Sequence, residues 1–307
     1  MGRVGLDGLV VPAGSRLLRD PFDSRLGGLP EGGAALLGVP WDWATSGRPG
    51  AREAPLRIRR VLYGLAVHSP SLGSLAVRPV DYGDLRVVPG GFEATMGRLE
   101  EAAYRLFERH GFTMFLGGDH SITEAIVSGL ARLYGRVCLL VLDAHYDMRS
   151  VEEGLTSGMW LWRLHERLRD RLVAAIVGIG EYANPSYLAR RAEEAGFLTV
   201  PALEVLRDPK AGLDAVEWLS RKECDAYYVS IDVDHIDQAY APGVNSPNPL
   251  GLRPEHTLQI LYWAQKLNPR GADIVEVVPQ ADPTGSTVRL AALIAATTIH
   301  LYSNSLI

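Results

Sequence analysis

The strongest constraint on the fold is an alternation of short apolar runs with longer amphipathic stretches along the chain. Short runs rich in Val, Ile, Leu and aromatic residues are typical of buried strands, and apolar residues that recur every three or four positions indicate helices. Strands that alternate with helices favour a parallel sheet covered by helices on both faces. We therefore predict an α/β protein with three α/β/α layers and a central, mostly parallel sheet.

The predicted elements follow this alternation. The strand candidates occupy residues 34–40, 112–118, 137–143, 172–180, 225–233 and 273–279. The helix candidates occupy residues 91–110, 122–134, 185–196, 212–222, 253–267 and 287–302. Because no linker, repeat or shift in composition marks a boundary, we expect residues 1–307 to form a single domain.

Composition argues against several classes of function. The chain has a formal net charge of −5 and no run of Lys or Arg, so it lacks the basic surface expected of a nucleic-acid-binding protein. No stretch approaches the roughly 18 apolar residues of a membrane span, and residues 1–14 lack the pattern of a signal peptide. We therefore expect a cytoplasmic protein with a small-molecule substrate, no nucleic-acid partner and no membrane contact.

The two cysteines, Cys138 and Cys224, each lie beside an apolar, strand-like run. Because a buried, unlinked thiol is the common state of such a cysteine, we predict two free thiols rather than a disulfide or a pair of thiolate ligands. A metal site in this chain would then be built from histidine and carboxylate side chains.

Three of the strand candidates end in acidic and histidine side chains. The run LLVLDAHYDM (139–148) places Asp143, His145 and Asp147 at alternate positions, which point to the same face of an extended backbone. The carboxyl ends of parallel strands share one edge of a sheet, so we expect the residues that follow them to converge. The other two strand ends contribute Asp119, His120, Asp232, Asp234 and Asp237.

Taken alone, each of these residues has an ordinary structural explanation, since a single Asp after a strand usually forms a turn or caps a helix. Together, the carboxylates would repel one another unless a cation lay among them. The candidate ligands are four of these carboxylates and both imidazoles: Asp143, Asp147, Asp232, Asp234, His120 and His145. Such a set without a thiolate suits Mn²⁺, with Fe, Co or Ni as alternatives. Six ligands are too many for one tetrahedral ion, so we predict two ions that activate water, and therefore a hydrolase.

Three motifs resemble the signatures of the ureohydrolase family, which includes arginase, agmatinase and formiminoglutamase: GGDHS (117–121), DAHYD (143–147) and SIDVDHID (230–237). The resemblance extends to residues 38–59, 81–85 and 273–292, so it covers nearly the whole chain. It implies an arginase-like fold, a centre of two Mn²⁺ ions, and a homo-oligomer that is a trimer or a hexamer.

The resemblance also implies a role for each metal ligand. One ion would be held by His120, Asp143, Asp147 and Asp232. The other would be held by His145, Asp143, Asp232 and Asp234, so that Asp143 and Asp232 bridge the two ions. Asp147 would in addition be catalytic, because it would pass a proton to the leaving amine.

Glu276 is the second candidate catalytic residue and the candidate anchor for the substrate. It lies in DIVEVVP (273–279), where a carboxylate on a buried face is costly unless a cation pairs with it. A guanidinium group fits this role, because its planar donors match a carboxylate. The resemblance implies that this glutamate holds the guanidinium group of the substrate while urea and an amine are released. A salt bridge to a neighbouring Arg is the structural alternative.

The loop after the second motif departs from the family pattern. Ureohydrolases carry a histidine close behind a serine here, whereas Ser157 is followed by Gly158. His165, Glu181 or a water molecule are candidates to replace this histidine. Because the histidine assists proton transfer, its absence keeps a non-catalytic or regulatory ureohydrolase-fold protein as the rival interpretation. A pocket plugged by the tryptophans of residues 160–162 would favour that rival.

The same loop bears on the identity of the substrate. Arg149, Glu152 and Glu153 look closer to the loop of agmatinases than to that of arginases, and an acidic loop suits the free amine of agmatine. Arg149 and Ser157 are candidate substrate contacts, and Arg149 can equally bind a carboxylate. We therefore predict hydrolysis of agmatine to putrescine and urea, with arginine, guanidinobutyrate and formiminoglutamate as alternative substrates.

Overall fold

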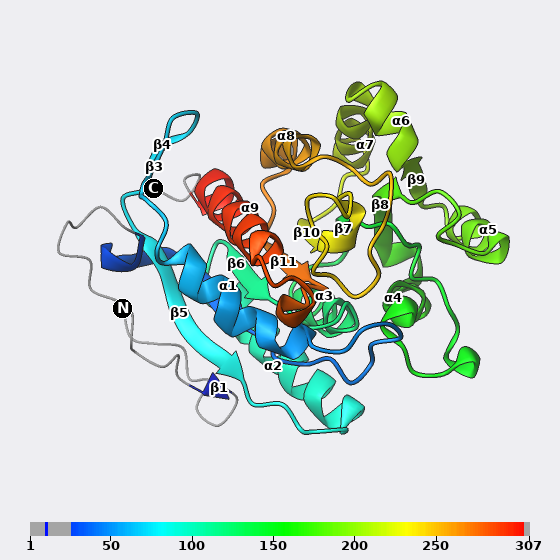
Figure 1. Cartoon of the computed structure of the whole chain (residues 1–307). Coiled ribbons are helices and arrows are strands. Elements are labelled where there is room, and N and C mark those ends of the chain that lie inside the picture. The colour runs from blue at the N-terminus through cyan, green and yellow to red at the C-terminus, as the bar shows by residue number, and fades with distance from the viewer. Residues whose placement is uncertain (1–9, 12–25, 304–307) are drawn as a thin grey trace.

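A nine-stranded sheet forms the centre of the computed structural model, which describes residues 10–11 and 26–303 (Figure 1). The strand order is β1-β5-β2-β6-β11-β10-β7-β8-β9, and every pairing is parallel except that of β1 with β5. The strands are β1 Val10–Val11, β2 Glu31–Gly38, β5 Arg78–Leu85, β6 Thr113–Leu116, β7 Val137–Leu142, β8 Leu172–Ile179, β9 Leu198–Pro201, β10 Ala226–Asp232 and β11 Gly271–Val275. Two short strands, β3 His68–Ser69 and β4 Gly73–Ser74, pair separately.

Helices cover both faces of the sheet, which confirms the predicted three layers. One face packs against α1 Ala54–Leu62, α6 Ala202–Arg207, α7 Lys210–Ser220, α8 Pro254–Ala264 and α9 Ser286–Ser303. The other face packs against α2 Phe92–Arg109, α3 Ile122–Ala131, α4 Trp160–Leu168 and α5 Ser186–Glu194. The strands between these layers are therefore apolar on both sides, as strand β7 illustrates: Leu139 and Val141 pack into one helical layer, and Leu140 and Leu142 into the other.

All six predicted strands and all six predicted helices occur, with shifted ends. The candidates did not include the strands β1, β3, β4 and β9 or the helices α1, α4 and α6. The strand β5 was indicated only by the family resemblance of residues 81–85. The sequence of β5 is polar because Asp81 and Asp84 pair with the buried Arg59 of α1, at 3.0 and 2.9 Å. A search for apolar runs does not detect this strand, because its acidic residues form ion pairs with another element.

The prediction of two free thiols was wrong, because Cys138 and Cys224 form a disulfide. Cys138 lies in β7, and Cys224 comes just before β10. The parallel pairing places these strands side by side, with Cys138 opposite Tyr227, so the two Cα atoms are 5.8 Å apart. The sequence placed each cysteine beside a strand but did not show that the two strands are neighbours.

None of the described helices is long and apolar enough to cross a membrane. The N-terminal stretch in which no signal peptide was predicted, residues 1–14, lies outside the described residues except for Val10–Val11.

The strand order determines where the functional residues meet. The four strands β6, β11, β10 and β7 are consecutive neighbours and run parallel, so their carboxyl ends lie at one edge of the sheet. Each of the predicted motifs follows one of these strands. A crevice at this edge is the usual place for a site in a parallel α/β sheet.

Candidate metal centre and substrate pocket

His120 forms the centre of a first group of candidate ligands. It lies between β6 and α3, and its side chain is buried. Its Nδ1 atom faces three carboxylate oxygens: Asp143 Oδ2 at 3.1 Å, Asp147 Oδ2 at 3.2 Å and Asp232 Oδ2 at 3.0 Å. These four residues are the set predicted for one ion, and the structure brings them together.

His145 forms the centre of a second group. Its Nδ1 atom lies 3.0 Å from Oδ2 of Asp234 and 3.5 Å from Oδ1 of Asp143. Asp143 therefore offers one oxygen to each group, as a bridging ligand does. Asp232 directs Oδ2 to His120, while its Oδ1 accepts a 2.8 Å hydrogen bond from the backbone N–H of Asp234. The bridging role of Asp232 stays a prediction.

The electrostatics of the cluster fit a bound cation. Burial, together with the neighbouring carboxylates Asp234 and Asp143, raises the pKa of Asp232 well above its usual value. Burial and the carboxylates of Asp147 and Asp234 likewise raise the pKa of Asp143. The facing atoms His120 Nδ1 and Asp143 Oδ2 are buried without a hydrogen-bond partner among the described residues. Unpaired lone pairs in a site from which water is excluded are costly, and divalent metal ions would satisfy them.

A buried hydrogen-bond chain behind His120 fixes which ring nitrogen faces the carboxylates. Nε2 of His120 lies 2.9 Å from Oγ of Ser230, which donates a 2.7 Å hydrogen bond to Asp273. Asp273 is buried and also accepts a hydrogen bond from the hydroxyl of Tyr228 at 2.9 Å. This chain was not predicted from the sequence, although Ser230 stands two residues before Asp232 and therefore shares its strand face.

Asp147 is held from outside the cluster by a tryptophan. Its backbone has a φ of 50°, a left-handed conformation that few residues other than glycine adopt. The indole Nε1 of Trp160 donates a 2.7 Å hydrogen bond to Oδ2 of Asp147, and the indole ring stacks on His120 at 4.7 Å. Neither Trp160 nor Trp162 lines the pocket over the cluster. The tryptophans therefore do not plug the site.

Glu276 follows directly after β11 and also has a left-handed backbone, with a φ of 64°. Its side chain is buried, and Oε1 accepts a 2.7 Å hydrogen bond from the backbone N–H of His120. Oε2 is buried without a partner, and no described Arg pairs with it. Burial and the nearby Asp119 raise the pKa of Glu276 to about 8. A buried carboxylate with one unpaired oxygen is prepared for a cationic ligand.

A cavity of about 290 Å³ opens over this cluster. Its polar wall includes Arg149 and Ser157, both predicted as substrate contacts, and three side chains that the sequence analysis missed: Asn184, Asn245 and Ser246. Of the two acidic residues in the loop, Glu152 is exposed and does not line the cavity, and the side chain of Glu153 lies outside the described part.

The stem of an arginine lies beside Gly158, the residue that follows Ser157 where the family carries a histidine. The backbone N–H of Arg149 donates to the carbonyl of Gly158 at 2.9 Å. A Cβ atom at position 158 would lie 3.2 Å from Cδ of Arg149 and 3.5 Å from Oδ1 of Asp147, so glycine gives the arginine room. Neither His165 nor Glu181 lines the cavity. Neither therefore replaces the histidine in this structure.

A strand-end cluster with two metal-ligand groups, beneath an open polar pocket, defines a hydrolase site. Residues 33–300 match the arginase family. The chain belongs to the arginase family and is an enzyme that hydrolyses carbon–nitrogen bonds of amidino groups.

Three similar proteins show the range of this family. The mitochondrial guanidino acid hydrolase of Homo sapiens is 36% identical over 270 residues, which cover 86% of this chain and 76% of that protein. The mitochondrial agmatinase of Gallus gallus is 33% identical, over 90% of this chain and 82% of that protein. The structure of formimidoylglutamase from Bacillus subtilis has a TM-score of 0.85 and 25% identity, and covers 95% of this chain and 97% of its own.

Proposed function

We propose that this enzyme uses two Mn²⁺ ions to hydrolyse a linear guanidino compound to urea and an amine. The observation that carries the proposal is the unpaired Oε2 of Glu276, which lies in the wall of the pocket that also contains the His–Asp cluster. A guanidinium group on this oxygen would have its central carbon within the same small cavity as the metal ligands. The six ligands and their hard donor atoms suit Mn²⁺.

The residues of the chain divide the work of the reaction. When bound, the two ions supply the Lewis acidity that activates water near neutral pH. Glu276 binds and orients the guanidinium group, because its backbone and Oε1 are both fixed. Asp147 receives a proton at Oδ1 and delivers it to the leaving amine, while Trp160 holds its Oδ2.

Agmatine is the first candidate substrate, and the similarity to an agmatinase supports it. The tail of agmatine is an ammonium group. The wall of the cavity, however, includes Arg149 and does not include Glu152. Repulsion between the positive charge of Arg149 and the ammonium group of agmatine would oppose binding of this tail.

A guanidino acid is the second candidate, and Arg149 is the observation that favours it. A carboxylate tail would pair with the arginine, and the amide side chains Asn184 and Asn245 could donate further hydrogen bonds. The similarity to a guanidino acid hydrolase supports this candidate. Formiminoglutamate also carries carboxylates, but it would release formamide instead of urea.

Agmatine and 4-guanidinobutyrate form a matched pair, because both carry a guanidinium group on a short chain and differ in the charge of the tail. The experiment is to load the protein with Mn²⁺ and to measure kcat/KM for both, with formiminoglutamate in parallel. The variant Arg149→Gln should lower kcat/KM for guanidinobutyrate by about tenfold or more and raise it for agmatine. The control is Arg190→Gln, on the exposed surface of α5.

The outcomes separate the hypotheses. Preference for agmatine that is insensitive to Arg149→Gln would select agmatine and remove the arginine from substrate recognition. Formamide without urea would identify a formimino substrate and overturn the proposed reaction. The absence of any product from protein that holds two equivalents of Mn²⁺ would favour the regulatory rival.

A further inference from the structure

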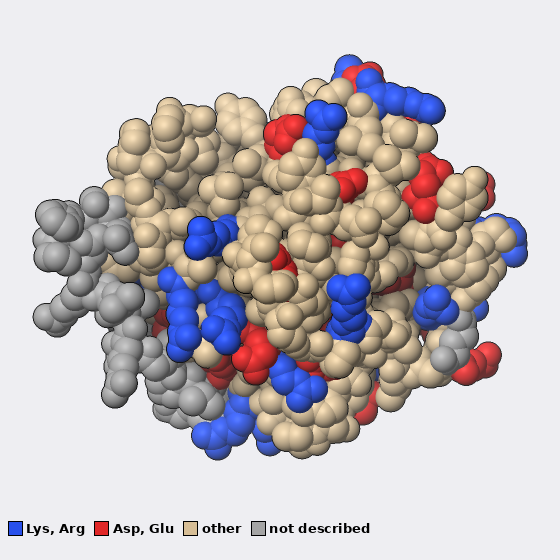
Figure 2. All heavy atoms as spheres, in the orientation of Figure 1, with Lys and Arg blue, Asp and Glu red and all other residues tan. Residues whose placement is uncertain are grey.

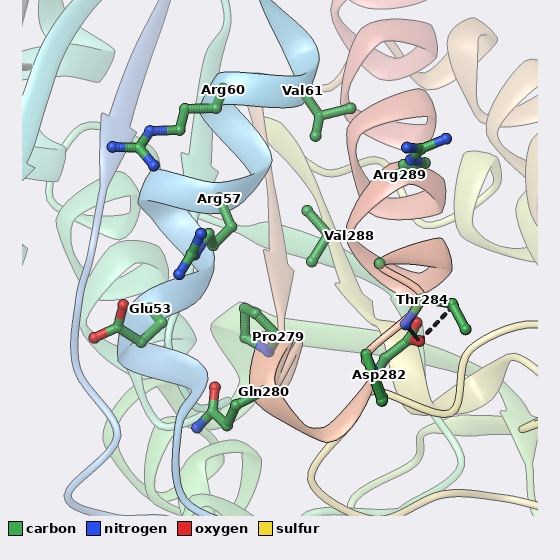
Figure 3. Close-up of a pocket in the computed structure, with 12 residues that line it drawn as sticks. Glu53, Arg57, Arg60, Val61, Pro279, Gln280, Asp282, Thr284, Val288 and Arg289 are labelled. Atoms are coloured by element: carbon green, nitrogen blue, oxygen red, sulfur yellow. Dashed lines mark hydrogen bonds between the residues drawn. The ribbon is translucent and has the colours of Figure 1, made fainter.

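A second and larger cavity, of about 670 Å³, lies between α1 and α9, away from the metal ligands (Figure 3). Val61 of α1 and Val288 of α9 face each other between the two helices, and Pro279 lies near one end. None of the described residues that line this cavity belongs to the candidate metal centre. The cavity thus combines an apolar interior with a separate set of polar groups.

Three of the polar groups are arginines without a partner among the described residues. Arg57 and Arg60 stand three residues apart on one side of α1, and Arg289 projects from α9. All three side chains are exposed, and none forms an ion pair or a side-chain hydrogen bond with another described residue. Arg59, one position away, shows the contrast, because two carboxylates pair with it. Figure 2 shows basic side chains gathered over the part of the surface that α1 occupies.

The acidic groups of the cavity do not neutralise these arginines. Both oxygens of Asp282 accept hydrogen bonds from the first turn of α9 and the residues before it, the donors being Thr284, Ser286 and Thr287. Glu53 is the remaining acidic residue of the lining. Three guanidinium groups against one available carboxylate leave an excess of positive charge.

We propose that the cavity between α1 and α9 binds a small dianion, which carries either two carboxylates on a short carbon chain or one phosphate group. Guanidinium groups bind such anions through paired hydrogen bonds, and their long stems can bring them over the groove from either helix. The valines and Pro279 provide apolar contact for the carbon chain. The volume of about 670 Å³ suits a molecule of metabolite size, and it exceeds the volume of about 290 Å³ of the cavity over the metal ligands.

The walls of this cavity connect to the substrate pocket. Nε2 of Gln280 donates a 3.1 Å hydrogen bond to the carbonyl of Pro49, in the loop whose residues Ser46 and Gly47 line the pocket. Gly50 has a φ of 130°, and a Cβ atom there would collide with the Gln280 side chain at 1.4 Å. A ligand that contacts Gln280 would therefore also set the position of this loop. We expect binding to change KM for the substrate.

The test measures binding directly and does not depend on catalysis, so it stands apart from the proposed function. Succinate, inorganic phosphate and glycerol 3-phosphate are titrated calorimetrically into the Mn²⁺-loaded protein at about 150 mM salt, where weak surface attraction is screened. Succinate tests a carboxylate source and the other two test a phosphate source. We expect at least one of them to bind once per chain.

Variants then locate the binding. Arg57→Gln and Arg289→Gln should each raise the dissociation constant of the anion about tenfold. Arg190→Gln, on α5, should leave it unchanged. These arginines are exposed and unpaired, so their replacement should not disturb folding, which a melting curve checks. Binding that falls only in Arg149→Gln would place the anion in the substrate pocket and overturn the proposal. Failure of all three anions to bind would overturn it as well.

Discussion

The indole nitrogen of Trp160 donates a 2.7 Å hydrogen bond to Oδ2 of Asp147, the same oxygen that lies 3.2 Å from Nδ1 of His120. Trp160 thus fixes the carboxylate for which we propose two roles, as a metal ligand and as the proton carrier. The tryptophan is fully buried and stacks on the His120 ring. It acts as a positioning residue, because it reaches the reacting groups only through Asp147 and His120.

The variant Trp160→Phe tests this relationship. Phenylalanine keeps a ring beside His120 but removes the N–H donor, and a hydrogen bond to a charged group is worth about 1.5–3 kcal/mol. We expect kcat to fall by about tenfold or more with little change in KM, because Trp160 does not line the pocket. The measurement is steady-state kinetics with Mn²⁺ content determined in parallel. Trp162→Phe is the matched control, and an equal loss in both variants would contradict a specific role for Trp160.

Glu276→Gln tests the anchor for the guanidinium group. The amide NH₂ group of glutamine would face the N–H groups of the substrate guanidinium, and two donors cannot form a hydrogen bond with each other. KM should therefore rise by about 10- to 100-fold. The bound Mn²⁺ should stay at two equivalents, because Glu276 is not one of the predicted ligands. The free energy of unfolding should not fall, since the variant removes a buried carboxylate oxygen that has no partner.

Glu124 provides the control for Glu276, because it is another buried glutamate but pairs with Arg163 at 2.7 Å. Glu124→Gln should destabilise the protein, since it leaves the arginine without its partner, and should leave KM unchanged. A normal KM in Glu276→Gln would remove Glu276 from substrate binding and count against the proposed function.

The convergence of the candidate ligands could be predicted because its signal is local. Asp143, His145 and Asp147 follow β7, which ends at Leu142, and parallel topology brings the ends of neighbouring strands together. The three residues do not lie on an extended backbone as predicted, because the chain leaves the sheet after Leu142 and Asp147 has a left-handed conformation. Groups that depend on contacts between distant segments were not predictable in this way. Trp160 reaches Asp147 from the start of α4, and Asn245 enters the pocket from a loop that follows β10.

The left-handed backbones of Asp147 and Glu276 illustrate the same limit. The sequence placed Glu276 inside a strand that extends to residue 279, whereas β11 ends at Val275. At this turn the backbone N–H of Glu276 donates a hydrogen bond to the carbonyl of Gly118 on a neighbouring segment. Residues other than glycine rarely adopt this conformation, and nothing in the sequence alone signals it.

Because Cys138 and Cys224 form a disulfide, we expect the untreated protein to contain no free thiol. Unfolding the untreated protein in guanidinium chloride and adding a thiol reagent should give no reaction, and prior reduction should expose two thiols. The closed loop is long, since 86 positions separate the cysteines, so reduction should lower the free energy of unfolding by about 2–4 kcal/mol. Two reactive thiols in the untreated protein would restore the sequence-based interpretation.

Asp282 should make a pH-dependent contribution to stability at the start of α9. Although burial opposes it, hydrogen bonds from Thr284, Thr287 and Ser286 hold the pKa of Asp282 well below its usual value. A lowered pKa stabilises the folded state at pH values above the ordinary aspartate pKa, and this contribution is lost as the pH falls below it.

Asp282→Ala should therefore cost about 0.5–2 kcal/mol at pH 7, the usual cost of removing a helix cap. Urea unfolding of the metal-free protein should show that the difference between variant and parent is constant down to about pH 5 and shrinks below about pH 4. A difference that grows toward acid pH would show that the carboxylate is not the stabilising form.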